Sequence, residues 1–213
     1  MLEERMFKVT SPHSSVPLKV VPGHFATSHA HVNYYIDITT LKTRQSEAAE
    51  VAHELAARYM SNTLVDTIVC LDGTQVIGGF LAEAFSRAGF LSINAHQTIY
   101  VVAPETDSAG QFFFRDNLLL ALRGKHVLLL TAMVTTGISL AQAAECVAYY
   151  GGKTVGAAAI FSDIDTVGEV SVQHLFSSKD VPNYQAFTHN DCPYCKAGKK
   201  LEALVNSFGY SAL

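Results

Sequence analysis

The stretch that most constrains the fold is residues 125–140, which read KHVLLLTAMVTTGISL. A continuous apolar run at 127–130 is followed by a short polar loop at 135–139, and apolar residues at helical spacing continue over 140–150. This order predicts a buried strand, a tight loop and a helix, as in α/β proteins with a mostly parallel sheet. In such sheets, ligands bind at the carboxyl ends of the strands, so we expect the loop to lie at a binding site.

The loop itself is Thr135-Thr136-Gly137-Ile138-Ser139. At a helix N-terminus, backbone N–H groups are free and the helix dipole is positive, and the hydroxyl groups of the loop add further donors. The pattern therefore predicts a phosphate-binding loop. A tight βα turn that binds nothing is the alternative.

Alternating helix and strand signals extend through the rest of the chain. We expect helices at 46–60, 76–88 and 140–150, and strands at 65–71, 92–102, 127–130 and 155–161. Ser46 is the expected cap of the first helix and Gly89 the expected end of the second, while residues 104–111 are polar and read as a loop. The pattern predicts a mostly parallel sheet flanked by helices.

The 213 residues are interpreted as a single domain in three parts. Residues 1–40 contain several prolines and short extended pieces, which predicts an irregular N-terminal hood. Residues 41–185 carry the α/β core, and residues 186–213 form a short cysteine-containing tail in which 196–207 could be helical.

Composition and charge narrow the classes of function. Hydrophobic residues make up 49% of the chain and charged residues 16%, which indicates a substantial core. The formal net charge is −4 without a basic block, so we expect no nucleic-acid partner. No apolar run approaches the roughly 20 residues that span a bilayer, and the N-terminus lacks a signal-peptide pattern. We expect a cytoplasmic protein with no membrane partner.

Three landmarks resemble the type I phosphoribosyltransferases, and orotate phosphoribosyltransferases in particular. Residues 23–25 (Gly-His-Phe), Ser28 and residues 34–37 (Tyr-Tyr-Ile-Asp) are similar to the N-terminal signature of the orotate enzymes. Residues 72–74 match the family's pyrophosphate loop in position, and residues 135–139 match its phosphate-binding motif. The resemblance implies a hood over a five-stranded parallel sheet, a homodimer, and a ligand built like phosphoribosyl pyrophosphate or a nucleoside monophosphate.

Two departures from the family pattern bear on catalysis. The family ends the strand before the phosphate loop in two acidic residues, which hold the ribose and its magnesium, whereas this chain has Thr131 and Ala132. The mobile loop of orotate-type enzymes carries Lys and His, whereas the basic residues between 88 and 122 are His96 and Arg115 here. The ribose-facing and leaving-group contacts are therefore reduced, and magnesium is expected only if the protein is active. Arg115 is the candidate substitute for the missing loop cations.

Other residues near the expected site have two interpretations each. Asp72-Gly73-Thr74 is a candidate pyrophosphate loop or an ordinary turn. Tyr35 and Asp37 could contact a base, or could pack within the hood around a capped carboxylate. Lys42 and Arg44 could line the anion site, although solvated surface charges are the simpler reading.

The C-terminal tail predicts a zinc site. His189, Cys192 and Cys195 place an imidazole beside two thiols at knuckle spacing, and these are ligands that zinc prefers. The fourth ligand is left open, with another subunit or one of four residues as candidates: Asp191, His174, Cys70 and Cys146. Redox chemistry is an alternative, because Cys-Pro-Tyr-Cys also occurs in glutaredoxin-like proteins. Unliganded thiols are the third reading.

A second group of histidines lies in the hood. His24, His29 and His31 are close in sequence, and they fit either a metal or phosphate role or a polar flap surface.

These observations leave three functional hypotheses. The first is a phosphoribosyltransferase-family protein that binds a 5-phosphoribosyl ligand with weak or lost catalysis. The second is an active orotate-type enzyme of pyrimidine nucleotide synthesis. The third is a zinc-stabilised or redox partner protein with a vestigial pocket. The loop at 135–139 argues against the third, and Thr131 with Ala132 argues against the second.

Overall fold

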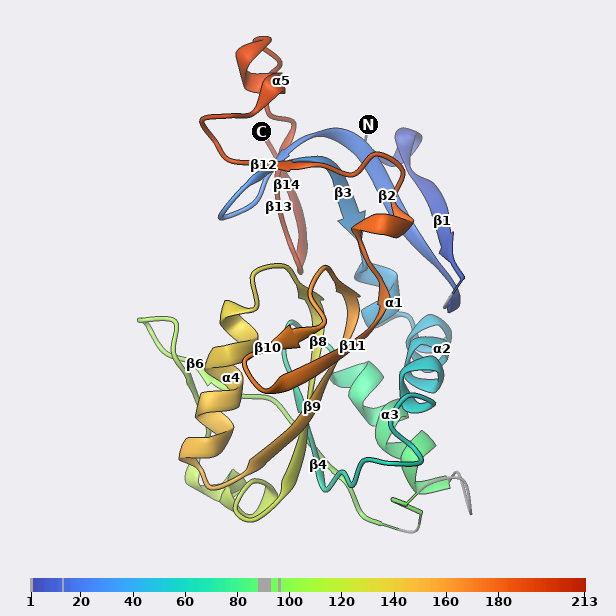
Figure 1. Cartoon of the computed structure of the whole chain (residues 1–213), viewed down its shortest axis with the longest axis vertical. Coiled ribbons are helices and arrows are strands. Elements are labelled where there is room, and N and C mark those ends of the chain that lie inside the picture. The colour runs from blue at the N-terminus through green and yellow to red at the C-terminus, as the bar shows by residue number, and fades with distance from the viewer. Residues whose placement is uncertain (1, 13, 88–92, 96) are drawn as a thin grey trace. The chain divides into compact units, whose positions relative to one another are not determined.

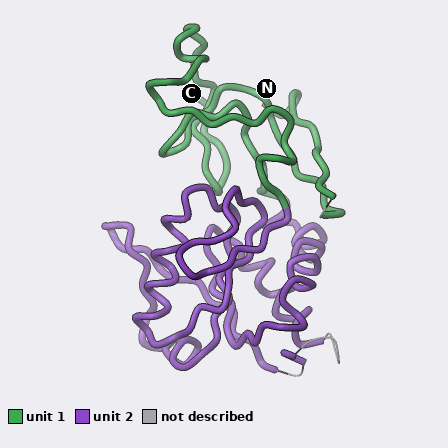
Figure 2. The backbone as a smooth tube through the Cα atoms, viewed as in Figure 1, with its two compact units in different colours: residues 1–40, 176–213 green, residues 41–175 purple. Residues whose placement is uncertain are grey.

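The structure is a computed structural model that describes residues 2–12, 14–87, 93–95 and 97–213. The chain forms two compact units (Figure 2). Unit 1 contains residues 1–40 and 176–213, and unit 2 contains residues 41–175. The expected hood and tail therefore belong to one unit, and the α/β core ends at residue 175, ten residues before the predicted boundary of 185.

Unit 2 is built on a sheet with the strand order β10-β11-β9-β8-β4-β5. Its strands are β4 (Thr67–Cys70), β5 (Tyr100–Val102), β8 (His126–Val134), β9 (Lys153–Ser162), β10 (Thr166–Val167) and β11 (Val170–Phe176). The pairs β5/β4, β4/β8 and β8/β9 are parallel, which confirms the mostly parallel sheet. The edge differs from the implied five-stranded parallel sheet, because β10 and β11 pair antiparallel.

Helices cover both faces of this sheet. They are α2 (Gln45–Ala56), α3 (Gln75–Arg87), α4 (Ile138–Tyr149) and the 3-10 helix η3 (Asp116–Ala121), with α1 (Thr39–Thr43) before them. Figure 1 shows α4 on one side of the sheet and α2 and α3 on the other. Residues 127–130 of β8 are fully buried, as expected for a strand that is apolar on both faces. None of the helices among the described residues is long and apolar enough to cross a membrane.

Several predicted boundaries in unit 2 were wrong. The expected strand at 92–102 is confined to β5, and the described residues 93–95 form a turn. The expected loop at 104–111 contains the strand β6 (Glu105–Thr106) and the turn after it. β6 forms a hairpin with β7 (Phe112–Phe113), which follows directly. The Asp107 carboxylate tightens this hairpin by accepting N–H groups at 2.8 and 2.9 Å. Ser92 and His96, and the expected helix end at Ala88 and Gly89, lie outside the described residues.

The predicted cap at Ser46 was also wrong. Helix α2 begins one residue earlier, and its N-cap is Arg44 in an extended conformation. Ser46 is the second residue of the helix, so its backbone is helical and it cannot take the cap geometry. The helix is held by its buried face, which includes Val51 and Leu55, rather than by a cap.

Unit 1 is a regular sheet rather than an irregular hood. Its strands are β1 (Phe7–Ser11), β2 (Ser14–Ala26), β3 (His31–Asp37), β12 (Ala186–Phe187), β13 (Ala203–Asn206) and β14 (Gly209–Ala212). They run in the order β12-β3-β2-β13-β14, with β1 paired to β2. Pro22 is accommodated because the β2/β3 register shifts between Pro22 and Phe25. The predicted hood is thus completed by strands from the tail.

The predicted helix at 196–207 does not form. The short helix α5 (Pro193–Lys196) ends where the prediction begins, and residues 203–206 are β13 instead. Pairing explains the difference, because β13 is parallel to β2 and antiparallel to β14. Two short 3-10 helices, η1 (Leu2–Arg5) and η4 (Ser178–Asp180), complete unit 1.

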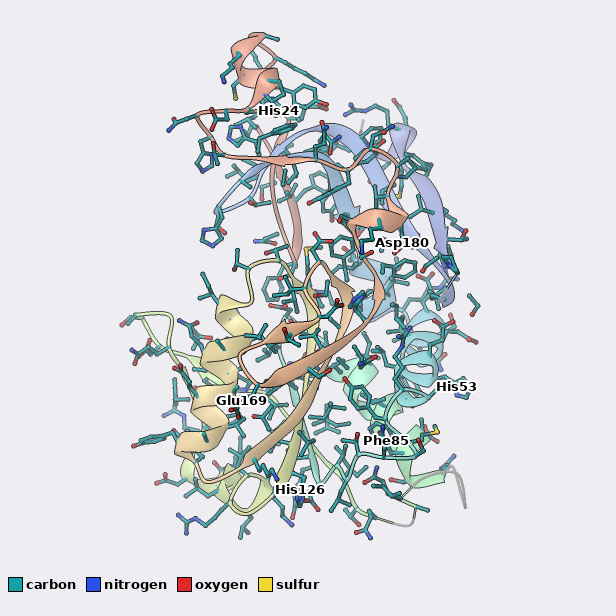
Figure 3. The ribbon with its side chains drawn as sticks, viewed as in Figure 1. His24, His53, Phe85, His126, Glu169 and Asp180 are labelled. Atoms are coloured by element: carbon teal, nitrogen blue, oxygen red, sulfur yellow. The ribbon has the colours of Figure 1, made fainter. Side chains whose placement is uncertain are left out.

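A carboxylate at the amino ends of β4 and β8 predicts a pH-dependent stability. The Asp66 carboxylate accepts the backbone N–H of His126 at 2.8 Å and contacts its ring Nδ1 at 2.9 Å (His126 is labelled in Figure 3). Burial would raise the pKa of Asp66, but the His126 contacts together with the charge of Lys125 outweigh burial, and the pKa is lowered. A lowered carboxyl pKa stabilises the folded state above the unfolded pKa of about 4, and the gain is lost as pH falls through the folded pKa.

We therefore expect Asp66→Asn to reduce the free energy of unfolding at pH 6, with a smaller difference from the unmodified chain at pH 3. Urea unfolding at both pH values measures this. Asp116→Asn, at an exposed site at the start of η3, is the matched control. Equal losses at both pH values would contradict the assignment to the carboxylate charge.

Candidate functional site

The loop at residues 135–139 joins β8 to α4, as the sequence predicts. Ile138 and Ser139 are the first residues of α4, and both are exposed together with Thr135 and Thr136. The N-cap is Gly137, so no side chain caps the first N–H groups of the helix. A small pocket of about 50 Å³ lies here, lined by Thr131 and residues 133–140. Its donors and its size suit a single anionic group, whereas whole small-molecule ligands fill roughly 300 Å³ or more.

Gly137 is needed for both its backbone and its lack of a side chain. Its φ of +77° lies in the left-handed region that favours glycine. A Cβ at this position would lie 2.7 Å from Cγ2 of Val167 and 3.0 Å from Cδ1 of Ile164. Ile164, before β10, and Val167, in β10, therefore pack against Gly137 and leave no room for a side chain there.

The second turn, Asp72-Gly73-Thr74, follows β4 at the same edge of the sheet. Asp72 and Gly73 both have positive φ, of 54° and 76°. Such a conformation is uncommon for a residue other than glycine and often marks a functional position. The buried Thr74 hydroxyl donates to Leu71 O at 2.8 Å and lies 3.1 Å from Leu130 O, which ties the turn to β8.

The two turns bring a carboxylate to the position where the family's acidic pair is missing. The Thr131 hydroxyl donates to Oδ2 of Asp72 at 2.7 Å. Ala132 is fully buried and faces the opposite side of β8 from Thr131, since adjacent strand residues alternate between faces. Asp72 thus supplies a charged oxygen beside Thr131. Sequence reasoning missed this role, although the signal was available: both residues sit at the carboxyl ends of neighbouring parallel strands.

Lys42 also reaches this turn, in contrast to the solvated charge that its sequence suggested. The Lys42 side chain is buried, and Nζ donates to the carbonyl oxygen of Asp72 at 2.6 Å. Burial lowers the pKa of Lys42, while the Asp72 charge acts against that shift. Arg44 is as predicted: its side chain is 68% exposed and pairs with Glu47.

Arg115, the candidate substitute for the missing loop cations, is already paired. Its guanidinium binds both carboxylate oxygens of Glu105 at 2.8 and 2.7 Å and lies 5.0 Å from the centre of the Phe113 ring. These contacts link β6 to the residues at the end of β7 and just after it. In this arrangement Arg115 is engaged by Glu105 in an exposed ion pair.

Tyr35 and Asp37 are placed as the hood-packing interpretation expects. The Tyr35 ring is buried in unit 1 and packs edge-on against Phe25 and Tyr210. Its hydroxyl lies 3.4 Å from Oδ1 of Asp37, which also accepts the N–H of Thr39 at 2.9 Å. Burial, followed by the Asp37 charge, raises the pKa of Tyr35 to about 12. The Tyr35 ring is thus used in packing, whereas Asp37 is half-buried, and a role of either residue at a base stays a prediction.

Four metal-type side chains assemble in unit 1, and this group differs from the predicted set of His189, Cys192 and Cys195. Cys192 and Cys195 lie beside His24 and His31. His189 is exposed and packs its ring edge-on against His31 rather than joining the group. The four residues proposed as fourth ligand lie elsewhere: Asp191 near Lys196, His174 paired with Asp165, Cys70 in β4 and Cys146 in α4.

Comparison with known proteins agrees with the resemblance to phosphoribosyltransferases that the sequence shows. No family model matches the chain. An orotate phosphoribosyltransferase of Sulfurimonas denitrificans is 26% identical over 193 residues, which are 85% of this chain and 90% of that relative. Among solved structures, UMP synthase of Leishmania donovani gives a TM-score of 0.55 at 16% identity, and covers 84% of this chain and 36% of that one. Orotate phosphoribosyltransferase of Mycobacterium tuberculosis in complex with inorganic phosphate gives 0.51 at 16% identity, over 70% and 80%.

The fold and the loop at the end of β8 define the class: the chain has the fold of the type I phosphoribosyltransferases. Within that class, the sequence relatives support an assignment to the orotate phosphoribosyltransferase-like proteins.

Proposed function

We propose that the protein binds the 5-phosphoribosyl group of phosphoribosyl pyrophosphate or of a nucleoside monophosphate, and that it turns this ligand over slowly or not at all. The observation that carries the proposal is the loop at 135–139, whose hydroxyls and helix N-terminal amides line a pocket of the size of one anionic group. The phosphate-bound Mycobacterium relative has the same fold and supports this reading.

The arrangement around the loop supports ribose binding that is weaker than in the family pattern. Thr131 offers a hydroxyl that already donates to Asp72, and Ala132 is buried. Among the described residues of the two turns, the Asp72 carboxylate is the charged acceptor for a ribose hydroxyl or for magnesium. One carboxylate in place of two removes a charged contact, and such contacts contribute about 1.5–3 kcal/mol each.

The state of the mobile-loop region supports slow turnover. A departing pyrophosphate needs positioned cations, and loss of one such group costs about 10²–10³ in rate. In the described part of the 103–114 segment the charged side chains are acidic, and Arg115 beside it is held by Glu105.

An active orotate-type phosphoribosyltransferase is the second candidate, and the relatives named orotate phosphoribosyltransferase favour it. In this case Asp72 would hold magnesium with the ribose, and Lys42 would support the pyrophosphate turn. Orotate-type relatives share their mobile loop between subunits, so this candidate implies a homodimer.

Ligand-dependent stabilisation tests the proposal. The protein is heated with inorganic phosphate, phosphoribosyl pyrophosphate or orotidine monophosphate, each with and without magnesium. A ligand at 100 times its dissociation constant stabilises the folded state by about 2.7 kcal/mol, which raises the melting temperature. We expect stabilisation by the phosphoribosyl ligands, and none by ribose without phosphate.

A turnover assay with orotate, phosphoribosyl pyrophosphate and magnesium then separates the two candidates. Slow or absent formation of orotidine monophosphate, combined with clear ligand stabilisation, supports the binding protein. Fast turnover supports the enzyme, and no stabilisation by any phosphoribosyl ligand contradicts both.

A further inference from the structure

Four side chains from distant parts of the chain converge in unit 1: His24, His31, Cys192 and Cys195. Their donor atoms all lie within 4.8 Å of one another. Three of the four residues are buried, and Cys195 is the exposed member. Figure 3 labels His24 close to the turn that carries α5. Two thiol sulfurs and two imidazole nitrogens at such distances are a ligand set that zinc prefers.

The fold brings these residues together through strand pairing. His24 lies near the end of β2 and His31 begins β3, and the two strands form a hairpin in which Ala26 pairs with His31. On either side of this hairpin, β12 pairs with β3 and β13 pairs with β2. The segment between β12 and β13 is therefore fixed at both ends, and it carries the Cys-x-x-Cys turn to the hairpin.

Four of the six distances between the donor atoms match the edges of a tetrahedron around one ion, and all six are within 4.8 Å. Nε2 of His24 lies 3.4 Å from Sγ of Cys192, 3.7 Å from Sγ of Cys195 and 3.3 Å from Nδ1 of His31. Nδ1 of His31 lies 3.2 Å from Sγ of Cys195. Tetrahedral zinc with ordinary bond lengths places nitrogen about 3.3 Å from nitrogen and about 3.6 Å from sulfur.

The tautomer of His24 is set for ligation. Its Nδ1 lies 2.9 Å from the carbonyl oxygen of Lys199 and 3.2 Å from that of Lys200. A carbonyl can only accept, so Nδ1 carries the proton and Nε2 presents its lone pair to the two cysteines. A histidine that ligates a metal commonly donates its other N–H to a carbonyl in this way.

We propose that His24 Nε2, His31 Nδ1 and the thiolates of Cys192 and Cys195 bind one zinc ion. Four protein ligands fill the coordination sphere, so the ion is structural and has no open position for catalysis. A two-iron cluster is disfavoured, because its cysteines and histidines bind different iron atoms and cannot all be within contact distance.

The consequence for unit 1 is a crosslink between its two chain segments. The ion would join residues 24 and 31 to residues 192 and 195. Glu202 already forms two hydrogen bonds with the backbone of His24 beside this point. The Glu202 N–H donates to His24 O at 2.8 Å, and its Oε1 accepts the His24 N–H at 3.1 Å. Zinc extends this contact from the strand edge to the exposed Cys-x-x-Cys turn.

Metal analysis of the purified full-length chain tests the proposal. After dialysis against metal-free buffer we expect about one zinc per chain by mass spectrometry of the elements. Cys192→Ser and His31→Gln should each lower this content about tenfold. Cobalt substitution gives a readout that does not depend on variants, because tetrahedral Co(II) with sulfur ligands absorbs strongly in visible light.

Two matched variants sharpen the test. His189→Gln removes a histidine that packs against His31 without belonging to the cluster, and Cys146→Ser removes a thiol in α4. Both should retain zinc. The proposal is overturned if the unmodified protein holds no zinc and gives no tetrahedral cobalt spectrum. It is also overturned if His189→Gln loses the metal while His31→Gln keeps it, or if Cys192 and Cys195 are found as a disulfide.

Discussion

Replacing Gly137 by valine is expected to weaken the binding of phosphoribosyl pyrophosphate by about 100-fold or more. The substitution places a β-branched side chain at a φ of +77°, with its Cβ 2.7 Å from Val167. The loop must move to relieve this contact, and its amides and hydroxyls then no longer converge. Losing two hydrogen bonds to a charged group at about 1.5–3 kcal/mol each gives the stated factor. Titration calorimetry measures the change.

The matched control is Gly124→Val. Gly124 has a similar φ of +70°, but a Cβ there would meet no atom within 4 Å. Both variants should lose about 1–3 kcal/mol of stability from backbone strain, and Gly137→Val should lose more because of its contacts. Binding should survive in Gly124→Val. Unchanged affinity in a folded Gly137→Val protein would show that the loop is only a connection.

A milder variant separates loop chemistry from loop shape. Ser139→Ala removes one exposed hydroxyl without a clash, and Ser171→Ala removes an exposed hydroxyl on β11. We expect the first to weaken binding of inorganic phosphate by several-fold and the second to leave it unchanged.

Replacing Asp72 by asparagine is expected to weaken binding of phosphoribosyl pyrophosphate with magnesium by about 10–100-fold. Asparagine tolerates the positive φ of this position, so the turn should keep its shape while the charge is lost. The Thr131 hydroxyl can still donate to the amide oxygen. The effect should therefore come from the missing charge at the ribose and magnesium.

The comparison of two ligands makes this result specific. The proposal places inorganic phosphate at the 135–139 loop, so its affinity should not change in Asp72→Asn. Asp116→Asn, at an exposed position in η3, is the control for net charge. Equal weakening of both ligands would mean that Asp72 acts on the whole site through the fold, and an unchanged affinity for both would remove Asp72 from the ribose site.

Local patterns in the sequence predicted the parallel core well. The apolar run at 127–130, the glycine at 137 and the periodic residues after it are all neighbours in sequence, so the strand, loop and helix could be read directly. The position of residues 72–74 at the same sheet edge followed from the rule for parallel strands. These parts depend on short-range signals, and the structure places them as expected.

The parts that could not be predicted depend on pairing between distant residues. Residues 203–206 have a composition compatible with a helix, and their parallel pairing with β2 decides otherwise. The burial of Lys42 and the contact between Thr131 and Asp72 also require knowledge of which strands are adjacent. For the cluster in unit 1, the sequence pattern indicated Cys192 and Cys195 as metal ligands. It placed His24 and His31 in a separate group of histidines. Only strand pairing shows that these two histidines, rather than His189, reach the thiols.

The shared sheet of unit 1 has a consequence for the order in which the protein folds during synthesis. Strands β2 and β3 leave the ribosome early, but β13, which pairs with β2, is about 180 residues later. Residues 41–175 can fold in the meantime, because their contacts are more local. β1 and β3 can already pair with β2, so it is the end of β2 at Phe25 and Ala26 that stays unpaired on its β13 side during this interval and is open to pairing with other nascent chains. Slow translation or a missing C-terminal segment should therefore harm the yield of folded protein through β2 first.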